Sequence, residues 1–98
     1  MSLLVVLTAE AEADLDEAAQ WYEQWSAGLG VELVARVRDT LARIGDNPDL
    51  YPDVHNGIRR APGRRFPYGV FYRRQSGRVE VIAVFHDRRD PSIWRSRA

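Results

Sequence analysis

One histidine and a group of arginines are the side chains of this sequence best suited to chemistry. His86 follows the apolar run 79–85, so we expect it at the end of a strand, where a side chain can reach solvent. Cleavage of RNA without a metal needs a base for the 2′-hydroxyl, an acid for the leaving oxygen and positive charge beside the phosphate. His86 could supply the acid or base. The positive charge could come from Arg59, Arg60, Arg65 and Arg73.

His86 also has a structural interpretation, in which its ring hydrogen-bonds the charged tail near Asp87 or Asp90. The sequence favours this role, because a single histidine is a weak catalytic motif. The other histidine, His55, lies in a stretch rich in Pro and Asn and is expected to be exposed. Two distant histidines without any cysteine give no credible metal site, and we expect no cofactor.

The basic charge is all arginine and lies mainly in the second half of the chain. Residues 1–50 contain ten carboxylates and three arginines, whereas residues 51–98 contain four and eleven, or about −7 against +7. With no lysine present, every basic side chain is a guanidinium, which favours bidentate recognition of phosphate or carboxylate. A compositional bias towards arginine can equally explain the missing lysine, but not the clustering. The pI of about 6.7 argues against strong binding to RNA of any sequence.

Strand patterns dominate the second half. Apolar runs at 66–72 and 79–85 flank the turn 75–77, Gln-Ser-Gly, which predicts an antiparallel hairpin. Residues 58–61 predict a strand before it, and the valine-rich run 3–7 predicts a first, buried strand. On the last strand, simple alternation puts Val79, Val81, Ala83 and Phe85 on one face and Glu80, Ile82, Val84 and His86 on the other. Both faces are apolar in the middle, so this strand should be central and covered on both sides.

Two helices are expected between the first strand and the hairpin. Thr8 is a candidate N-cap for the first helix, and Asp14 falls outside that helix's apolar stripes. Residues 26–30, SAGLG, should break the helix. A second apolar face then follows over 33–44, with Gly45 as the C′ residue. The short connection makes the two helices an antiparallel hairpin.

The order β-α-α-β-β-β predicts an α+β fold in one domain, residues 1–98: a mainly antiparallel sheet of three or four strands with the helical hairpin packed on one face. Residues 47–57 should be a loop, and 87–98 a charged tail with one helical turn after Pro91. The predicted core consists of Val5, Leu7, Leu15, Ala18, Tyr22, Leu33, Val37, Leu41, Val70, Tyr72, Val81 and Ala83. Residues 1–7 lack a basic n-region and their apolar run is soon followed by acidic residues, so we expect neither a signal peptide nor a membrane span.

Four motifs in this order resemble the RelE/ParE superfamily of toxins from bacterial type II toxin–antitoxin systems, and most of all its ParE, or plasmid stabilisation, branch. The first is a strand leading into LTAEAEADL (7–15) and then Trp21-Tyr22. The others are NPxxYP (47–52), RRxxxxxFPYxxFY (59–72) and VxVxAVxHxxRDPxxWxxR (79–97). Together they cover nearly the whole chain.

The resemblance implies a cytoplasmic toxin that arrests growth and is held inactive by a cognate, ParD-like antitoxin. The ParE branch inhibits DNA gyrase, and the RelE branch cuts mRNA on the ribosome. RelE-like nucleases typically carry a lysine- and arginine-rich set with a tyrosine near the C-terminus. This chain has no lysine, and its last aromatic residue is Trp94, whose indole cannot act as an acid. The acidic helical half would also be repelled by ribosomal RNA.

We therefore favour DNA gyrase as the target, and expect the toxin to inhibit it by binding, without catalysing a reaction. The residues expected to bind it are Arg59, Arg60, Arg65, Arg88, Arg89, Trp94 and Arg95, because Arg and Trp are common at protein interfaces. The alternative is a RelE-like, metal-independent endoribonuclease that uses His86, Arg59, Arg65 and Arg73.

Antitoxin binding is expected at two places. Trp21 and Trp25 form a second aromatic stripe on the first helix, which either leaves an apolar patch for the antitoxin or packs, together with Tyr22, in the core. Arg73 and Arg74 are candidates to pair with the carboxylates of an acidic antitoxin peptide.

Overall fold

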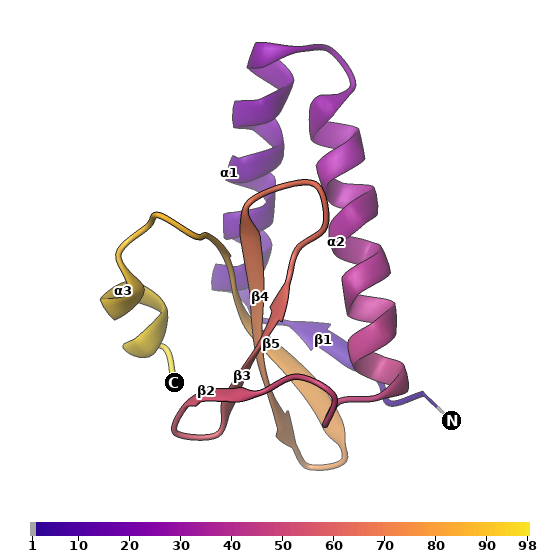
Figure 1. Ribbon diagram of the computed structural model, residues 1–98, viewed down its shortest axis with the longest axis vertical. Coiled ribbons are helices and arrows are strands. Elements are labelled where there is room, and N and C mark those ends of the chain that lie inside the picture. The colour runs from indigo at the N-terminus through magenta and orange to yellow at the C-terminus, as the bar shows by residue number, and fades with distance from the viewer. Residues whose placement is uncertain (1) are drawn as a thin grey trace.

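The computed structural model describes residues 2–98 as a sheet with two long helices on one face and a short helix on the other (Figure 1). The elements in chain order are β1 (Val5–Leu7), α1 (Ala9–Trp25), α2 (Leu29–Asp46), β2 (Asp53–His55), β3 (Ile58–Pro62), β4 (Tyr68–Gln75), β5 (Arg78–His86) and α3 (Pro91–Arg95). The five described strands lie in the order β1-β5-β4-β3-β2. β1 is parallel to β5 and the other pairs are antiparallel, so the predicted α+β fold is confirmed.

The β4–β5 hairpin turns at Ser76 and Gly77, as predicted. Both residues have positive φ, 53° and 75°, which is the geometry of a two-residue type I′ turn. The ladder runs from the pair Gln75 and Arg78 to the pair Tyr68 and His86. This is the longest strand pairing among residues 2–98.

The sheet has one strand more than predicted, because residues 53–55 of the expected loop form β2. This strand is short and its first two residues are exposed, so it has no apolar pattern. Its turn is Asn56-Gly57, with φ of 46° and 83°, and the Asp53 carboxylate accepts a hydrogen bond of 2.9 Å from the Gly57 N–H. Asn-Gly is a strong hairpin sequence. β1 also differs from the prediction, since it is a half-buried edge strand rather than a buried one.

The helical hairpin has the predicted direction but different boundaries. Thr8 caps α1 by accepting a 3.1 Å hydrogen bond from the Ala11 N–H. Gly30 was expected in the break but lies inside α2. A Cβ at this position would be 2.4 Å from the Ala19 carbonyl oxygen, so only glycine permits the close contact between the two helices. Gly45, expected as the C′ residue, lies in the last turn of α2, where its carbonyl accepts from the Leu3 N–H. Only a small residue fits beneath the N-terminal segment at that point.

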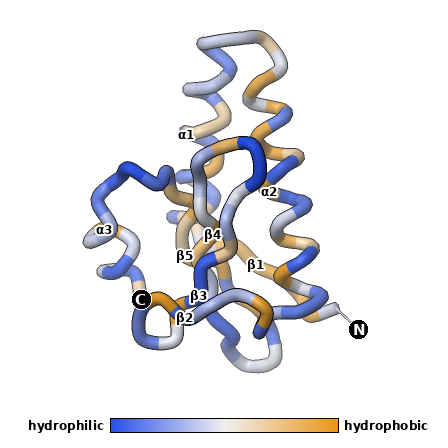
Figure 2. Tube along the Cα trace, viewed as in Figure 1, coloured by the Kyte–Doolittle hydropathy of each residue, from blue (hydrophilic) through white to orange (hydrophobic). Residues whose placement is uncertain are grey.

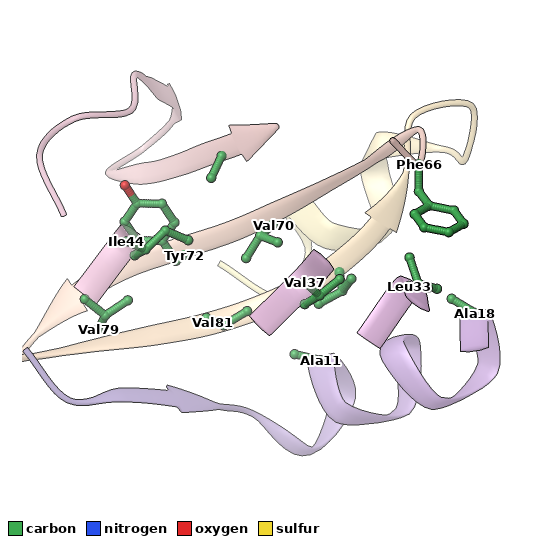
Figure 3. Packing of buried hydrophobic residues seen from close by; sticks show 12 residues of the cluster. Ala11, Ala18, Leu33, Val37, Ile44, Phe66, Val70, Tyr72, Val79 and Val81 are labelled. Atoms are coloured by element: carbon green, nitrogen blue, oxygen red, sulfur yellow. The ribbon is translucent and has the colours of Figure 1, made fainter. Parts of the chain in front are cut away.

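The main core lies between the sheet and the two helices (Figure 3). All the predicted core residues except Ala83 contribute to it, some as half-buried neighbours. The exception follows from a β-bulge: Tyr72 pairs with Val81 but Phe71 pairs with Ala83, which leaves Ile82 as an extra residue. The bulge inverts the alternation beyond it. Val84 therefore faces the helices, and Ala83 faces the opposite side of the sheet, contrary to the prediction.

A second apolar cluster covers the opposite face of the sheet, as expected for a strand buried on both sides. It consists of Ile58, Phe71, Ile82, Ala83, Phe85 and Trp94. The segment that leads from β5 to α3 is hydrophilic (Figure 2), and Trp94 of α3 packs back on the sheet. We call this side the α3 face.

Candidate target-binding surface

The C-terminal segment, residues 87–98, is anchored on the α3 face by Trp94. Its ring is 5% exposed and stacks on Phe71 with centroids 4.3 Å apart and planes at 23°. The ring of His55, in β2, is also edge-on to the indole, with centroids 5.9 Å apart. The tryptophan of the fourth motif therefore fixes the segment to the sheet.

Asp90 begins the short helix that carries Trp94. Its carboxylate accepts a 2.9 Å hydrogen bond from the Ser92 N–H, and Pro91 occupies the first turn, where its missing N–H costs nothing. Hydrogen bonds from the Ser92 backbone and side chain lower the pKa of the Asp90 carboxyl, so the cap is charged at neutral pH.

A hollow of about 260 Å³ lies beside Trp94 and is lined by four of the seven residues predicted to bind the target. Its floor is aromatic, with Phe71 and Phe85, and its lining includes Arg60, Arg89, Trp94 and Arg95. Arg88 lies next to it in the chain and is exposed. Five of the seven predicted residues therefore lie together, with Arg60 from β3 and the other four from the C-terminal segment.

Aromatic rings hold these guanidinium groups in place. The guanidinium of Arg89 lies 4.3 Å from the Phe85 ring centroid, and that of Arg95 lies 5.5 Å from the Trp94 ring. Arg60 lies across Gly69, where a Cβ would be 2.6 Å from its Nε, and forms a 2.6 Å ion pair with Asp87. These contacts orient the planar donors before any partner arrives.

The other two predicted target-binding arginines lie elsewhere. Arg59 donates to the Tyr51 and Asp49 carbonyls in the connection between α2 and β2. Arg65, in the loop between β3 and β4, forms an ion pair with Glu32 of α2. Neither lines the hollow among residues 2–98.

The candidate acid/base residue, His86, lies at the end of β5 with its ring edge-on to Tyr68 at 5.2 Å. Its Nδ1 accepts a 3.0 Å hydrogen bond from the Arg88 N–H, so the ring does hold the tail, through the backbone rather than through Asp87 or Asp90. Burial raises the pKa of the Tyr68 phenol, which therefore stays protonated at neutral pH.

The structure does not bring the three arginines of the nuclease hypothesis to His86. Arg59 and Arg65 make the contacts given above. Arg73 donates through Nε and Nη2 to one oxygen of Glu80, at 3.0 and 2.8 Å. The hollows beside His86 contain Arg60, Arg89 and Arg95 instead.

Residues 5–91 match the family described as the ParE toxin of the type II toxin–antitoxin system, parDE. The chain belongs to the ParE toxin family. Its structure is similar to a chain of the solved "Chromosomal ParDE TA system from P. aeruginosa", with a TM-score of 0.78 and 16% identity over 87% of this chain and 96% of that one. At that identity the likeness shows the fold. A search of curated protein sequences gives no match.

The aromatic stripe of this ParE family member on α1 divides into buried and exposed parts. Tyr22 packs into the core against Phe66, with ring centroids 4.9 Å apart. Trp21 and Trp25 contact each other at 5.6 Å and are 51% and 72% exposed. The alternative in which all three pack in the core is therefore wrong, because α1 turns only one stripe towards the sheet.

The two expected antitoxin contacts lie at opposite ends of the molecule. Trp25 ends α1 beside the helical turn, whereas Arg73 and Arg74 lie beside the β4–β5 turn at the other end (Figure 1). Arg74 forms a 3.2 Å ion pair with Asp49. A further apolar surface, a groove of about 600 Å³ between α1 and α2 that exposes Val31, was not predicted from the sequence. Val31 lies two residues from both Leu29 and Leu33, which pack in the core, so the sequence alone does not show that its side chain faces outwards.

Two further expectations concern metals and membranes. Among residues 2–98, no group of three or more potential ligands lies close enough together to hold a metal ion. None of the helices in that part of the chain combines the length and apolar character that crossing a bilayer requires.

Proposed function

We propose that this chain is a toxin that inhibits DNA gyrase by binding it through the α3 face, and that a cognate antitoxin neutralises it. Membership of the ParE family supports this choice. The single observation that favours binding over catalysis is the environment of His86: its Nδ1 is engaged by the tail, and Arg59, Arg65 and Arg73 are committed to other partners.

The proposed contact surface combines Arg60, Arg88, Arg89 and Arg95, whereas Trp94, which is 5% exposed, anchors this surface instead of presenting its ring to a partner. Arg is among the residues that most often dominate protein interfaces. Arg89 and Arg95 are already stacked on aromatic rings, so ordering them on binding costs less than ordering free side chains. Acidic side chains or backbone carbonyls of the target would accept from these donors.

The proposed antitoxin binds over Trp21 and Trp25 and pairs its carboxylates with Arg73 and Arg74. The molecule measures 38 Å along its longest axis. A peptide that reaches both ends would need about 11 extended residues, or about 25 in a helix. Such a partner would be an amphipathic, acidic chain that wraps the toxin rather than a compact domain.

Expression in cells tests the target. The chain is induced alone, and DNA-damage signalling and translation are followed over time. We expect damage signalling to rise first, from a cytoplasmic site of action on gyrase, and a flanking reading frame to relieve the arrest. Early translation arrest that is lost in a His86→Ala variant would support mRNA cleavage instead. Normal growth at high expression would contradict the toxin assignment itself.

A further inference from the structure

The edge of β5 is only partly covered by β1. β1 pairs with Val79 to Val81, and the Thr8 N–H then donates to the Val81 carbonyl. β1 ends at Leu7, where the chain turns into α1, whereas β5 continues to His86. Because of the bulge, the Ile82 carbonyl and the Val84 N–H both point to this uncovered edge, where no described strand pairs with them. Unpaired backbone groups at such an edge need other partners.

Asp14 and Arg97 provide them. The Asp14 carboxylate accepts a 3.1 Å hydrogen bond from the Val84 N–H, and Arg97 Nη1 donates to the Ile82 carbonyl at 3.1 Å. The two side chains also bind each other through two contacts, Nη1 to Oδ2 at 2.6 Å and Nη2 to Oδ1 at 3.2 Å. One ion pair therefore closes the strand edge in the place of a further strand.

This pair is largely shielded from solvent, with side-chain exposures of 5% for Asp14 and 17% for Arg97, and it joins distant parts of the chain. Asp14 is 7% exposed although it belongs to α1, where the sequence placed it on the polar side. Arg97 is 83 residues away, and its guanidinium also lies 5.2 Å from the Phe85 ring. Arg89 approaches the same carboxylate at 3.8 Å. We refer to Asp14 and Arg97 as the clamp.

The C-terminal segment has few other means of keeping its position. α3 has five residues, far too few to be stable by itself. Trp94 and the Arg60–Asp87 pair hold the segment from the α3 face. The clamp holds Arg97, near the end of the segment, at the β5 edge. The segment is therefore held near both of its ends.

We propose that Asp14 and Arg97 are positioning residues of the target-binding surface: the clamp holds residues 87–98 in one arrangement, so that Arg88, Arg89 and Arg95 meet the target already ordered. This inference rests on the proposed function. If the clamp is released, the segment must be reordered on binding, and each immobilised side chain then lowers the affinity. We expect inhibition of gyrase to weaken by about tenfold or more.

The position of the segment can be measured independently of any target. The chain has three tryptophans, and Trp94 is the buried one. In a Trp21→Phe/Trp25→Phe background its fluorescence reports docking alone. Arg97→Lys keeps the charge but lacks the planar guanidinium that donates to both Asp14 oxygens and the Ile82 carbonyl, and Arg97→Ala removes the contact. Asp14→Asn tests the pair from the other side. The matched control is Arg78→Ala, an exposed arginine for which no ion pair occurs within residues 2–98.

We expect both Arg97 variants to shift the Trp94 emission to longer wavelength and to raise its quenching by acrylamide, with the far-UV circular dichroism of α1 and α2 retained. In chains with native Trp21 and Trp25, the same substitutions should raise the toxin concentration needed to inhibit gyrase by about tenfold, while Arg78→Ala should not. Unchanged Trp94 emission in Arg97→Ala would refute the clamp. Released Trp94 with undiminished inhibition would refute its positioning role. Lack of inhibition by the parent chain would overturn the proposed function, and the fluorescence would still decide the clamp. If Asp14→Asn fails to fold, Arg97→Lys still gives a decision.

Discussion

Replacement of Trp94 by alanine removes the aromatic ring that joins the C-terminal segment to the sheet. A side chain of this size buries about 150–250 Å². At about 25 cal/mol per Å², its burial contributes about 4–6 kcal/mol. That area is an upper bound, because the unfolded chain is not fully extended. We therefore expect Trp94→Ala to lower the free energy of unfolding by about 3–5 kcal/mol, as for other buried tryptophans.

Such a loss is a large part of the stability of a small domain, about 5–15 kcal/mol. Urea unfolding followed by far-UV circular dichroism measures it without a fluorescent probe. Trp94→Phe should retain most of the stack on Phe71 and lose less. This second variant is suited to gyrase assays, because it should remain folded.

Trp25→Ala is the matched control. This side chain is 72% exposed and ends α1, so the free energy of unfolding should change by no more than about 0.5 kcal/mol. If Trp94→Ala costs less than about 1 kcal/mol, the indole does not anchor the segment in solution. The description of the α3 face would then be wrong, whatever the outcome with gyrase.

Three further predictions concern other contacts. Tyr72→Phe removes the buried hydroxyl that donates to the Pro48 carbonyl at 2.7 Å, and should cost about 1 kcal/mol in urea unfolding; no loss would mean that water replaces the contact. Glu23 accepts from two backbone N–H groups at the start of α2, which lowers the pKa of its carboxyl. Its stabilising effect should therefore be complete above the ordinary pKa of 4.5 and be lost as pH falls through the lower folded-state value, so Glu23→Gln should make stability less dependent on pH below about 5. Trp21→Ala/Trp25→Ala should weaken antitoxin binding in calorimetry while toxicity persists; unchanged antitoxin affinity would exclude this patch.

The elements with a local sequence pattern could be predicted. Ser76-Gly77 lies between two strand-like runs, and Thr8 precedes an apolar helical face, so the hairpin and α1 follow from short stretches of sequence. β2 was missed because its strand has no apolar pattern, although Asn56-Gly57 is itself a strong turn sequence.

The features that depend on distant parts of the chain could not be predicted in this way. The bulge at Ile82 changes which side chains face the helices. Residues 81–85 are all apolar, so the sequence does not mark the position at which the alternation shifts. Asp14 resembles a solvated helix carboxylate until Arg97 is brought beside it from 83 residues away. The same difference between local and long-range positioning applies to the candidate surface. Residues 88, 89, 94 and 95 are close in sequence, whereas the positions of Arg59 and Arg65 depend on pairing with other elements.

The most direct test of the central claim is a supercoiling assay with purified gyrase and purified chain. We predict inhibited supercoiling with cleaved DNA trapped on the enzyme, and weaker inhibition by Arg88→Ala and Arg95→Ala. Programmed ribosomes, treated in parallel, should keep their mRNA intact. Normal supercoiling at saturating toxin, together with mRNA cleavage that requires His86, would contradict the proposal.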